Sequence, residues 1–396
     1  MKKVVLAYSG GLDTSYCLKY LQHQGFEVHT VLINTGGFDA AELKAIEDRA
    51  YELGSAKHTN LDIIEKYYEK AIKYLVFGNV LKNNTYPLSV SAERVFQALE
   101  CIKYAKAQGA SAIAHGSTGA GNDQIRFDLI FQTIAPEIEI ITPIRDLKLS
   151  RQEEVAFLKE NGVNYSWEKA QYSINKGIWG TSVGGKETLT SNQPLPDEAY
   201  PSQLEKTTPE KVTLTFEKGE LVAVNGVKDI PTVNIVTLEN LANKFAIGRD
   251  THVGDTIIGI KGRVAFEAAA PLIIIKAHHL LEKHTLTKWQ QYWKDQLGNF
   301  YGMLFHEGQF LEPVMRNIEG FLQDSQSSVT GDVIVTLKPY HFTLDGIESK
   351  FDLMNSSFGQ YGEMNNAWSA EDAKGFIKIT GNAQAIYSQV NDLKYD

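Results

Sequence analysis

The chain has little cysteine and no long apolar run. Among its 396 residues only Cys17 and Cys101 carry thiols, which is too few for a disulfide framework. A membrane-spanning helix needs about 20 apolar residues, but the candidate "LIIIKAHHLL" at 272–281 is interrupted by lysine and histidine. The start "MKKVVLAYSGG" lacks the apolar core of a signal peptide. We therefore expect a cytoplasmic protein that is not bound to a membrane.

An excess of positive charge is also absent. The chain has 39 Lys and Arg against 48 Asp and Glu, a net charge of −9, which argues against non-specific binding of nucleic acid or anionic membranes. A hydrophobic fraction of 43% excludes disordered and fibrous classes. Single cores stop growing beyond roughly 250 to 300 residues, so the length predicts two domains. The partners we expect are small molecules.

The first part of the sequence alternates short β-rich runs with helical patterns. The predicted strands cover residues 3–8, 28–33, 57–61, 111–115 and 138–141. Such alternation is typical of an α/β fold, here a doubly wound parallel sheet covered on both faces. One helix is clearly delimited, because Asp39 can cap it, Glu42 completes a capping box and Gly54 ends it. Ligands bind beyond the carboxyl ends of such strands.

The pattern changes after about residue 165. Two irregular stretches, "NQPLPDEAYPSQ" and "EKTTPEK", precede the strand-rich "KVTLTFEKGELVAVNG". We therefore predict an N-terminal nucleotide-binding domain at 1–165 and a second, α+β domain at 166–396. The last stretch, "GNAQAIYSQVNDLKYD", predicts a terminal helix, which either docks on a partner subunit or packs on its own domain.

A glycine-hydroxyl loop, "AYSGGLDTS", follows the first strand. Gly10 and Gly11 allow positive φ and close approach of a ligand, while Ser9, Thr14 and Ser15 add hydroxyl donors. The next helix directs its free N–H groups and partial positive charge at the same place. The loop therefore predicts a site for phosphate or pyrophosphate.

Two better-known phosphate loops do not fit this segment. No Gly-Lys-Ser/Thr follows, as in a Walker A loop, and the third glycine of a dinucleotide fingerprint is missing. Asp13 would repel a bare phosphate, but it suits a magnesium ion bridging phosphates, or a helix cap. The alternative is a capped strand-to-helix turn that binds no ligand.

A second loop, "HGSTGAGNDQIRFD" at 115–128, combines three glycines with polar residues at a helix start. Asn122 and Arg126 are four residues apart, so both can face one ligand. Alternatively, Asn122 or Asp123 caps the helix and a solvated Arg126 pairs with a nearby aspartate. His115 is either a general base or, more often at the end of a buried strand, a packed histidine.

Taken together, these loops resemble the N-type ATP pyrophosphatases. Within that superfamily "AYSGGLDTS" and "HGSTGAGNDQIRFD" are similar to argininosuccinate synthases, as are "GNVLKNNTYPLS", "APEIEIITPIRD" and "EDAKGFIKITG". The resemblance implies a carbon-nitrogen ligase of arginine biosynthesis that uses ATP with Mg2+ and forms homotetramers. ATP would adenylate the ureido oxygen of citrulline, releasing pyrophosphate, and the amine of aspartate would then displace AMP.

The resemblance also implies roles for individual residues, and no resident metal site. Asp123 and Arg126 would be catalytic. ATP would bind at Ala7, Tyr8, Ser9, Gly10, Gly11, Leu12, Asp13, Thr14, Ser15, Ile33 and Gly116. Aspartate would bind at Thr118, Asn122 and Asp123. Citrulline would bind at Tyr86, Ser91, Arg94, Asn122, Arg126, Ser173 and Ser182.

Several positions depart from the family pattern. Ala120 stands where the family usually has a lysine. Near the acceptor amino acid, Val90 replaces a threonine, Gly184 and Gly254 replace glutamates, and Phe266 replaces a tyrosine, counted without gaps. Carboxylates there would receive the α-ammonium of citrulline, and a buried ammonium without a counter-charge is costly.

These departures suggest a variant that acts on an N-acylated citrulline, with N-acetyl or N-succinyl as candidates. Lys176 or Lys186 would meet a succinyl carboxylate, or would be solvated loop lysines. The alternatives are a wrong gap-free alignment, or drift compensated elsewhere. Free, N-acetyl and N-succinyl citrulline therefore all stay open as the acceptor.

Other signals point to ordinary structure. The pair His278-His279 lacks ligands at metal-site spacing, and the aromatic-rich 288–307 is typical of core or a subunit interface. A tRNA-modifying relative would need a basic face and reactive cysteines, and an amidotransferase would need an N-terminal cysteine. The remaining alternatives are a nucleotide-binding regulatory protein and another adenylating ATP pyrophosphatase.

Overall fold

The computed structural model describes residues 2–165, 172–359, 361–363 and 367–394. The chain divides into two compact units, one running to Phe351 and the other from Asp352 onward. The predicted boundary at 165/166 lies within the first unit and beside the undescribed residues 166–171, and it stays a prediction.

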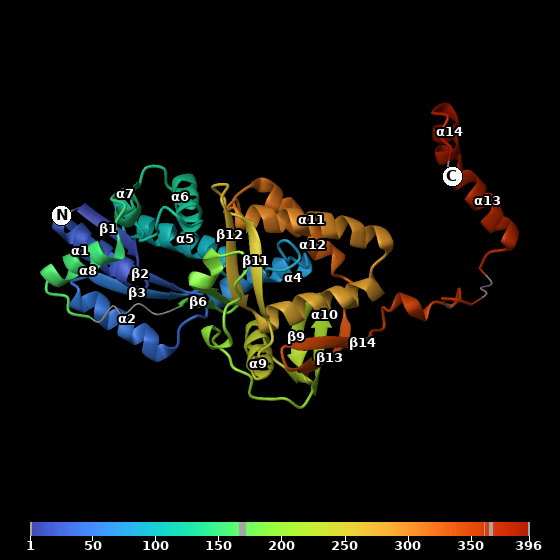
Figure 1. Ribbon diagram of the computed structural model, residues 1–396, viewed down its shortest axis with the longest axis horizontal. Helices are drawn as coiled ribbons and strands as arrows, with labels where there is room; N and C mark the ends of the chain where they lie inside the picture. Colours follow the sequence, from blue (N-terminus) through green and yellow to red (C-terminus); the bar gives the residue numbers. More distant parts are fainter. Residues whose placement is uncertain (1, 166–171, 360, 364–366, 395–396) are drawn as a thin grey trace. The chain divides into compact units, whose positions relative to one another are not determined.

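A five-stranded parallel sheet forms the first part of the larger unit (Figure 1). Its strands are β1 (Lys2–Ala7), β2 (Phe26–Asn34), β3 (Lys57–Asp62), β4 (Ala112–Ala114) and β5 (Glu139–Ile141). They lie in the order β3-β2-β1-β4-β5, and every neighbouring pair is parallel. The predicted strands, and the doubly wound sheet they imply, are confirmed.

Both faces of this sheet are buried. Side chains alternate along β1, so Val4 and Leu6 pack in one core and Val5 in another. The first face is covered by α1 (Leu12–His23), α2 (Ala40–Glu52), α7 (Pro143–Asp146) and α8 (Arg151–Glu160). The second face is covered by α5 (Ser89–Ala107) and α6 (Asp123–Ile134). Burial on both faces explains why the strands read as continuous apolar runs.

The capping prediction for α2 is confirmed. The Asp39 carboxylate accepts from the Glu42 N–H at 2.8 Å, and Glu42 accepts in return from the Asp39 N–H at 2.8 Å. The helix is followed by Gly54 with φ +89°. Along the chain, β3 and α5 are connected by α3 (Ile64–Tyr67), η1 (Tyr68–Ile72) and α4 (Lys73–Phe77).

Two antiparallel sheets follow along the chain. One has the order β10-β9-β8-β13-β14 and the other β11-β12-β7-β6. Their strands are β6 (Ser173–Gly177), β7 (Gly180–Gly184), β8 (Glu210–Glu217), β9 (Glu220–Val224), β10 (Val227–Lys228), β11 (Arg249–Asp255), β12 (Lys261–Glu267), β13 (Gly331–Lys338) and β14 (His341–Glu348). The strand-rich region predicted after the irregular crossing is confirmed as β8 and β9.

Helices pack against these sheets and share a core with α5. They are α9 (Pro231–Asn243), α10 (Ala269–Thr285), α11 (Lys288–His306) and α12 (Pro313–Ser325). Two short turns, η2 (Lys186–Leu189) and η3 (Asp197–Ala199), interrupt the irregular crossing. One continuous core links Val5 and Phe96 with Phe216 and Phe305, so the second face of the parallel sheet is sealed by the α+β part.

The smaller unit contains η4 (Leu353–Asn355), α13 (Ala370–Thr380) and α14 (Asn382–Val390). The predicted terminal helix is therefore confirmed as α14. Its apolar side chains are exposed, among them Ile386 at 60% and Val390 at 77%. None of the described helices is long and apolar enough to cross a bilayer.

Candidate active site

The glycine-hydroxyl loop joins β1 to α1 as predicted. Gly10 has φ +75°, and a Cβ there would lie 3.0 Å from the Ile46 side chain, so glycine meets both a conformational and a steric need. The Gly10 carbonyl accepts from Arg49 Nη1 at 2.5 Å. No side chain caps α1 at Gly11. Its first N–H groups are therefore available to an anion.

The second loop lies directly against the first. A Cβ on Gly116 would stand 3.2 Å from Asp13 Cβ and 3.3 Å from Thr14 Cγ2. Only glycine therefore lets the loop after β4 approach the start of α1 this closely. The contact brings the predicted ATP and aspartate segments to one edge of the sheet.

His115 is a packed histidine that holds the second loop. Its Nδ1 accepts from the Ser117 N–H at 3.2 Å, so the ring proton sits on Nε2, which donates to Asp128 at 2.9 Å. Asp128 also accepts from Arg145 Nη1 at 2.6 Å. Although burial alone would raise it, these two partners hold the pKa of Asp128 below its usual range.

A pair of carboxylates stands at the start of α1. Burial, together with the neighbouring Asp13 carboxylate, raises the pKa of Glu154 to about 8. The Glu154 Oε2 atom is buried and has no hydrogen-bond partner among the described residues. Two neighbouring carboxylates favour either a shared proton or a bound cation.

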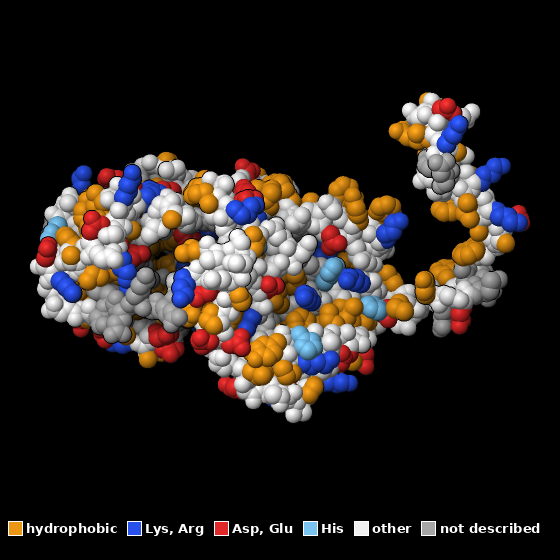
Figure 2. Space-filling model, viewed as in Figure 1, with side chains coloured by type: hydrophobic (Ala, Val, Ile, Leu, Met, Phe, Trp, Pro, Cys, Tyr) orange, Lys and Arg blue, Asp and Glu red, His pale blue; other side chains and the backbone are white. Residues whose placement is uncertain are grey.

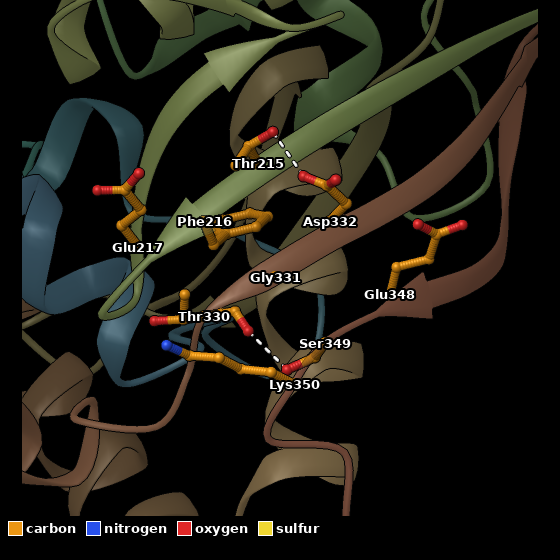
Figure 3. A pocket seen from close by; sticks show the side chains of 9 residues that line it. All are labelled: Thr215, Phe216, Glu217, Thr330, Gly331, Asp332, Glu348, Ser349 and Lys350. Carbon is orange, nitrogen blue, oxygen red and sulfur yellow. Dashed lines mark hydrogen bonds between the residues drawn. The ribbon is translucent and has the colours of Figure 1, made fainter. Parts of the chain in front are cut away.

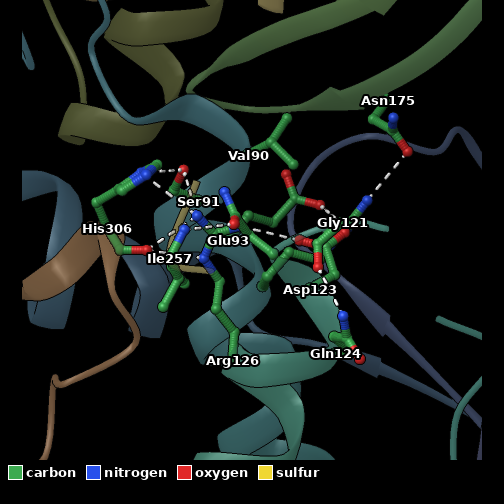
Figure 4. A network of polar contacts seen from close by, with 12 residues as sticks. Val90, Ser91, Glu93, Gly121, Asp123, Gln124, Arg126, Asn175, Ile257 and His306 are labelled. Atoms are coloured by element: carbon green, nitrogen blue, oxygen red, sulfur yellow. Dashed lines mark hydrogen bonds and ion pairs between the residues drawn. The ribbon is translucent and has the colours of Figure 1, made fainter. Parts of the chain in front are cut away.

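Arg94, Asp123 and Arg126 form an ion-pair network in which the Arg126 side chain is 4% exposed and the Asp123 side chain 37% exposed. Figure 4 labels Asp123 and Arg126. Asp123 accepts from Arg94 Nε at 3.1 Å and from Arg126 Nη1 at 2.9 Å. Burial alone would raise the pKa of Asp123, but the two guanidinium groups lower it. Arg94 also donates to Asn175 Oδ1 at 3.0 Å. The alternative of a solvated Arg126 is wrong, because Arg126 is only 3% exposed.

Glu93 adds a carboxylate that motif comparison missed. Its Oε1 accepts from Arg94 Nη1 at 3.1 Å and from Gln97 Nε2 at 2.8 Å. Burial raises its pKa to about 7, an effect that Arg94 only partly offsets. The sequence feature that could have identified Glu93 is its position directly before Arg94, as an ionisable residue on a helix with an apolar pattern.

These elements enclose a cleft of about 830 Å³. Many of the predicted site residues line it, namely Ala7, Tyr8, Ser9, Gly11, Leu12, Asp13, Thr14, Ile33, Arg94, Gly116, Thr118, Asp123 and Ser173. The cleft thus combines the phosphate loop, the glycine-rich second loop and one strand of the β11-β12-β7-β6 sheet. Glu42, Glu93 and Lys176 also line it.

Other predicted residues lie off the cleft lining. Gly10 and Ser15 belong to the loop segment but do not line the cleft. The remaining ones are Tyr86, Ser91, Asn122, Arg126 and Ser182, with the substituted positions Val90, Gly184, Gly254 and Phe266. Asn122 does not cap α6; its Oδ1 instead accepts from the Ile257 N–H at 2.9 Å.

Several of these residues pack together beside Arg126. The Tyr86 hydroxyl accepts from the Val90 N–H at 3.0 Å, and its ring lies 5.3 Å from that of Phe266. Arg126 Nη2 donates to Ser91 Oγ at 3.1 Å and to the His306 carbonyl at 2.9 Å. Sequence comparison missed His306, because it joins the site only through the end of α11.

A second hollow of about 440 Å³ lies on the β10-β9-β8-β13-β14 sheet, at the ends of β8, β13 and β14 (Figure 3). Its lining includes Asp332, which accepts from Thr215 Oγ1 at 2.6 Å, and Lys350. None of the predicted site residues lines it. The larger cleft is therefore the candidate active site.

Outside the cleft, charged side chains of both signs are mixed on the face in Figure 2, and the described residues form no cluster of metal ligands. No group of three or more His, Cys, Asp or Glu within the described ranges could hold a metal ion. His278 is buried between Asn79 Oδ1 at 2.7 Å and Gln326 Oε1 at 2.8 Å.

Comparisons with known proteins agree across almost the whole chain. Residues 3–164 match the model of the arginosuccinate synthase N-terminal HUP domain, and residues 172–387 match that of the arginosuccinate synthase C-terminal domain. An argininosuccinate synthase of Xanthomonas campestris is 37% identical over 98% of this chain and 99% of its own. Those of Dictyoglomus turgidum (36%; 98% of each chain) and Pyrococcus furiosus (37%; 96% and 92%) are similarly close.

Proposed function

Because the chain belongs to the argininosuccinate synthase family, we propose that it is an ATP-dependent carbon-nitrogen ligase of arginine biosynthesis. The products would be argininosuccinate or its N-acyl form, together with AMP and pyrophosphate. One observation supports this most directly. The close contact of Gly116 with Asp13 brings the uncapped start of α1 and the Arg94-Asp123 ion pair into one cleft.

In the first step the ureido oxygen of citrulline attacks the α-phosphorus of ATP, and the bond to the β-phosphate breaks. The leaving pyrophosphate carries the developing negative charge. Free N–H groups at the start of α1, with the Ser9 and Thr14 hydroxyls, are preorganised donors for that charge. We assign Ala7 through Ser15, Ile33 and Gly116 to ATP.

In the second step the aspartate amine forms a bond to the ureido carbon while the bond from that carbon to the AMP oxygen breaks. Thr118, Asn122 and Asp123 are assigned to aspartate. The citrulline assignments are Tyr86, Ser91, Arg94, Asn122, Arg126, Ser173 and Ser182. Asp123 and Arg126 are assigned a catalytic role, since their ion pair fixes charge at the cleft where the reacting groups would lie.

The residues at the phosphate loop fit a magnesium ion bound with ATP. Carboxylate oxygens are the ligands that Mg2+ prefers; Asp13 lines the cleft, and the buried Glu154 Oε2 beside it lacks a partner among the described residues. Asp13 is the residue that would hold the ion. A bound magnesium ion would neutralise phosphate charge as pyrophosphate leaves.

The assembly we propose is a homotetramer in the cytoplasm. The exposed aromatic side chains of α11, Trp289 at 64% and Trp293 at 56%, and the exposed apolar residues of α14 support burial against other subunits. Both thiols, Cys17 and Cys101, are buried and unpaired, which suits a reducing compartment.

Pyrophosphate and AMP release tests the proposed reaction. Purified protein would receive ATP, magnesium, aspartate and citrulline or N-acylated citrulline. We expect stoichiometric pyrophosphate and AMP that require both amino acids. A Gly116→Val variant should lose at least about tenfold in kcat/KM for ATP, because its side chain meets Asp13.

Gly320→Ala is the matched control, since Gly320 is exposed on α12 and a Cβ there meets nothing within 4 Å. ATP binding without pyrophosphate release under every acceptor condition would contradict the proposal and favour a nucleotide-binding regulatory protein.

A further inference from the structure

Four basic side chains from separate segments meet beside Tyr86. Lys82 forms a backbone bridge with Tyr86, through N–H to carbonyl distances of 2.8 and 3.1 Å. The His252 ring of β11 stacks on Tyr86 with 5.4 Å between centroids. Arg126 of α6 donates to the backbone and side chain of His306 at the end of α11. We call Lys82, Arg126, His252 and His306 the basic cluster.

Several nitrogen atoms of the basic cluster have no partner among the described residues. Arg126 can only donate, so the Nδ1 atom of His306 that it contacts at 3.3 Å is the acceptor. The ring proton of His306 therefore sits on Nε2, which is buried and unpaired. His252 Nδ1 is also buried and unpaired. No described hydrogen bond or ion pair engages the Lys82 ammonium.

The carboxylates around the basic cluster already have partners. Asp255 pairs with Lys261 at 2.6 Å, and Glu307 accepts from Gln309 at 3.0 Å. Asp123 is held by Arg94 and Arg126. Donors are therefore in excess over acceptors in a mostly buried region, which is the composition of an anion site.

The pKa shifts within the basic cluster are also consistent with an anion site. Burial, followed by Arg126, Lys82 and His252, lowers the pKa of His306 to about 3. Burial, only partly opposed by Glu307 and Asp255, lowers the pKa of Lys82. A bound carboxylate would relieve this accumulation of positive charge.

Position 254 faces two side-chain nitrogen atoms. A Cβ on Gly254 would lie 2.7 Å from His252 Nε2 and 3.2 Å from Asn83 Nδ2. No carboxylate therefore projects from this position toward the acceptor region, where the family pattern implies one. An α-ammonium of free citrulline would face Lys82 and Arg126 instead of a counter-charge.

We propose, on the basis of the ligase function above, that the basic cluster binds a carboxylate carried by the acyl group of an N-acylated citrulline. The preferred acceptor class is then citrulline whose α-nitrogen bears a dicarboxylic acyl group. Acylation removes the positive charge of the α-nitrogen, and the second carboxylate takes the unpaired donors of Lys82, His252 and His306.

The test compares initial rates of pyrophosphate release with N-succinyl, N-acetyl and free citrulline, at fixed ATP, magnesium and aspartate. Wild-type protein should show a kcat/KM for N-succinyl citrulline about 10- to 100-fold above the other two, the value of one or two charge-assisted hydrogen bonds. Lys82→Met should remove that preference while its rate with N-acetyl citrulline stays within about threefold.

Lys82→Arg keeps the charge and should retain part of the preference, which separates recognition from misfolding. Lys176→Met is the matched control, because Lys176 also lines the cleft but lies on β6, away from the basic cluster. Loss of the preference in Lys176→Met rather than Lys82→Met would overturn the assignment to the basic cluster.

The remaining outcomes separate this inference from the proposed function. A wild-type preference for free or N-acetyl citrulline overturns the inference and leaves the ligase function intact. An equal loss for all three acceptors in Lys82→Met also overturns it, because the basic cluster would then bind the α-carboxylate they share. Absence of pyrophosphate release with every acceptor overturns the ligase function and the inference together.

Discussion

The phosphate loop and the acceptor region are built in opposite ways. The loop is nine consecutive residues whose donors are backbone N–H groups and small hydroxyls, and its geometry follows from one strand, one turn and one helix. The acceptor region combines α5, α6, β11 and the end of α11, with buried charges that satisfy one another. A contiguous site tolerates change around it, whereas an assembled site depends on every segment.

The largest expected effect is at Arg126, which ties three of those segments together. Arg126→Met removes the donor to the buried His306 carbonyl and one of the two guanidinium partners of Asp123, which keeps its ion pair with Arg94. We expect a loss on the order of 3 kcal/mol in the free energy of unfolding, from the buried acceptors left without a donor, and no measurable ligation. Denaturant unfolding and pyrophosphate release would measure both.

Lys44→Met is the control for Arg126→Met, because Lys44 forms an exposed i,i+4 pair with Asp48. Its loss should leave the free energy of unfolding unchanged within the error of the measurement, because solvent and salt screen an exposed pair. Equal losses in the two variants would mean that burial of the network adds nothing.

The next largest effect is the pH dependence of stability that comes from Glu93 in the acceptor region. The pKa of Glu93 is raised to about 7 in the folded state by burial, so the folded chain binds this proton more tightly than the unfolded chain does. Its contribution to stability is fully present below about pH 4.5 and decreases as pH rises to about 7, by an amount on the order of 3 kcal/mol.

A Glu93→Gln variant should lack this decrease. Unfolding free energies at pH 5 and pH 8 would be compared with those of wild type and of Glu160→Gln, an exposed carboxylate on α8. The same pH slope in wild type and Glu93→Gln would contradict the assignment of the titration to this residue.

The phosphate loop should respond differently, with loss of ATP affinity and only a modest loss of stability. Gly10→Ala places a side chain at φ +75° and against Ile46. We expect a cost of about 1 to 2 kcal/mol from the backbone and a rise of about tenfold in KM for ATP.

Gly25→Ala separates the two causes, because Gly25 has φ +81° and a Cβ there meets nothing within 4 Å. It should show the backbone cost alone, with KM for ATP unchanged. A similar rise in KM in both variants would show that general loosening, rather than loop geometry, weakens ATP binding.

The smallest effect is expected at the cap of α2, which presents Ile46 and Arg49 to the loop. Asp39→Ala removes the acceptor of the Glu42 N–H and should cost about 1 kcal/mol. Asp39→Asn keeps an acceptor and should cost only a few tenths. Thermal unfolding of both variants measures the difference, and identical values would contradict a capping role.

Local rules were sufficient for the parallel sheet and for the phosphate loop. Apolar runs, glycine positions and the Asp39 cap are short-range signals, so strands β1 to β5 and helix α2 were predictable within a few residues. The buried role of Glu93 and the participation of Lys82, His252 and His306 were not. Their neighbours are distant in sequence, and no periodicity records which segments will meet.

The sequence by itself therefore determined the sheet, the anion-binding start of α1 and the family to which the chain is similar, because these depend on residues a few positions apart. Only the tertiary structure decided that Arg126 is buried rather than solvated, that Gly254 faces the side-chain nitrogens of His252 and Asn83, and that His252 and His306 have unpaired ring nitrogens in the basic cluster. The physical reason is desolvation. The free-energy cost of burying a charged group depends on the partners around it, and the whole fold decides which partners those are.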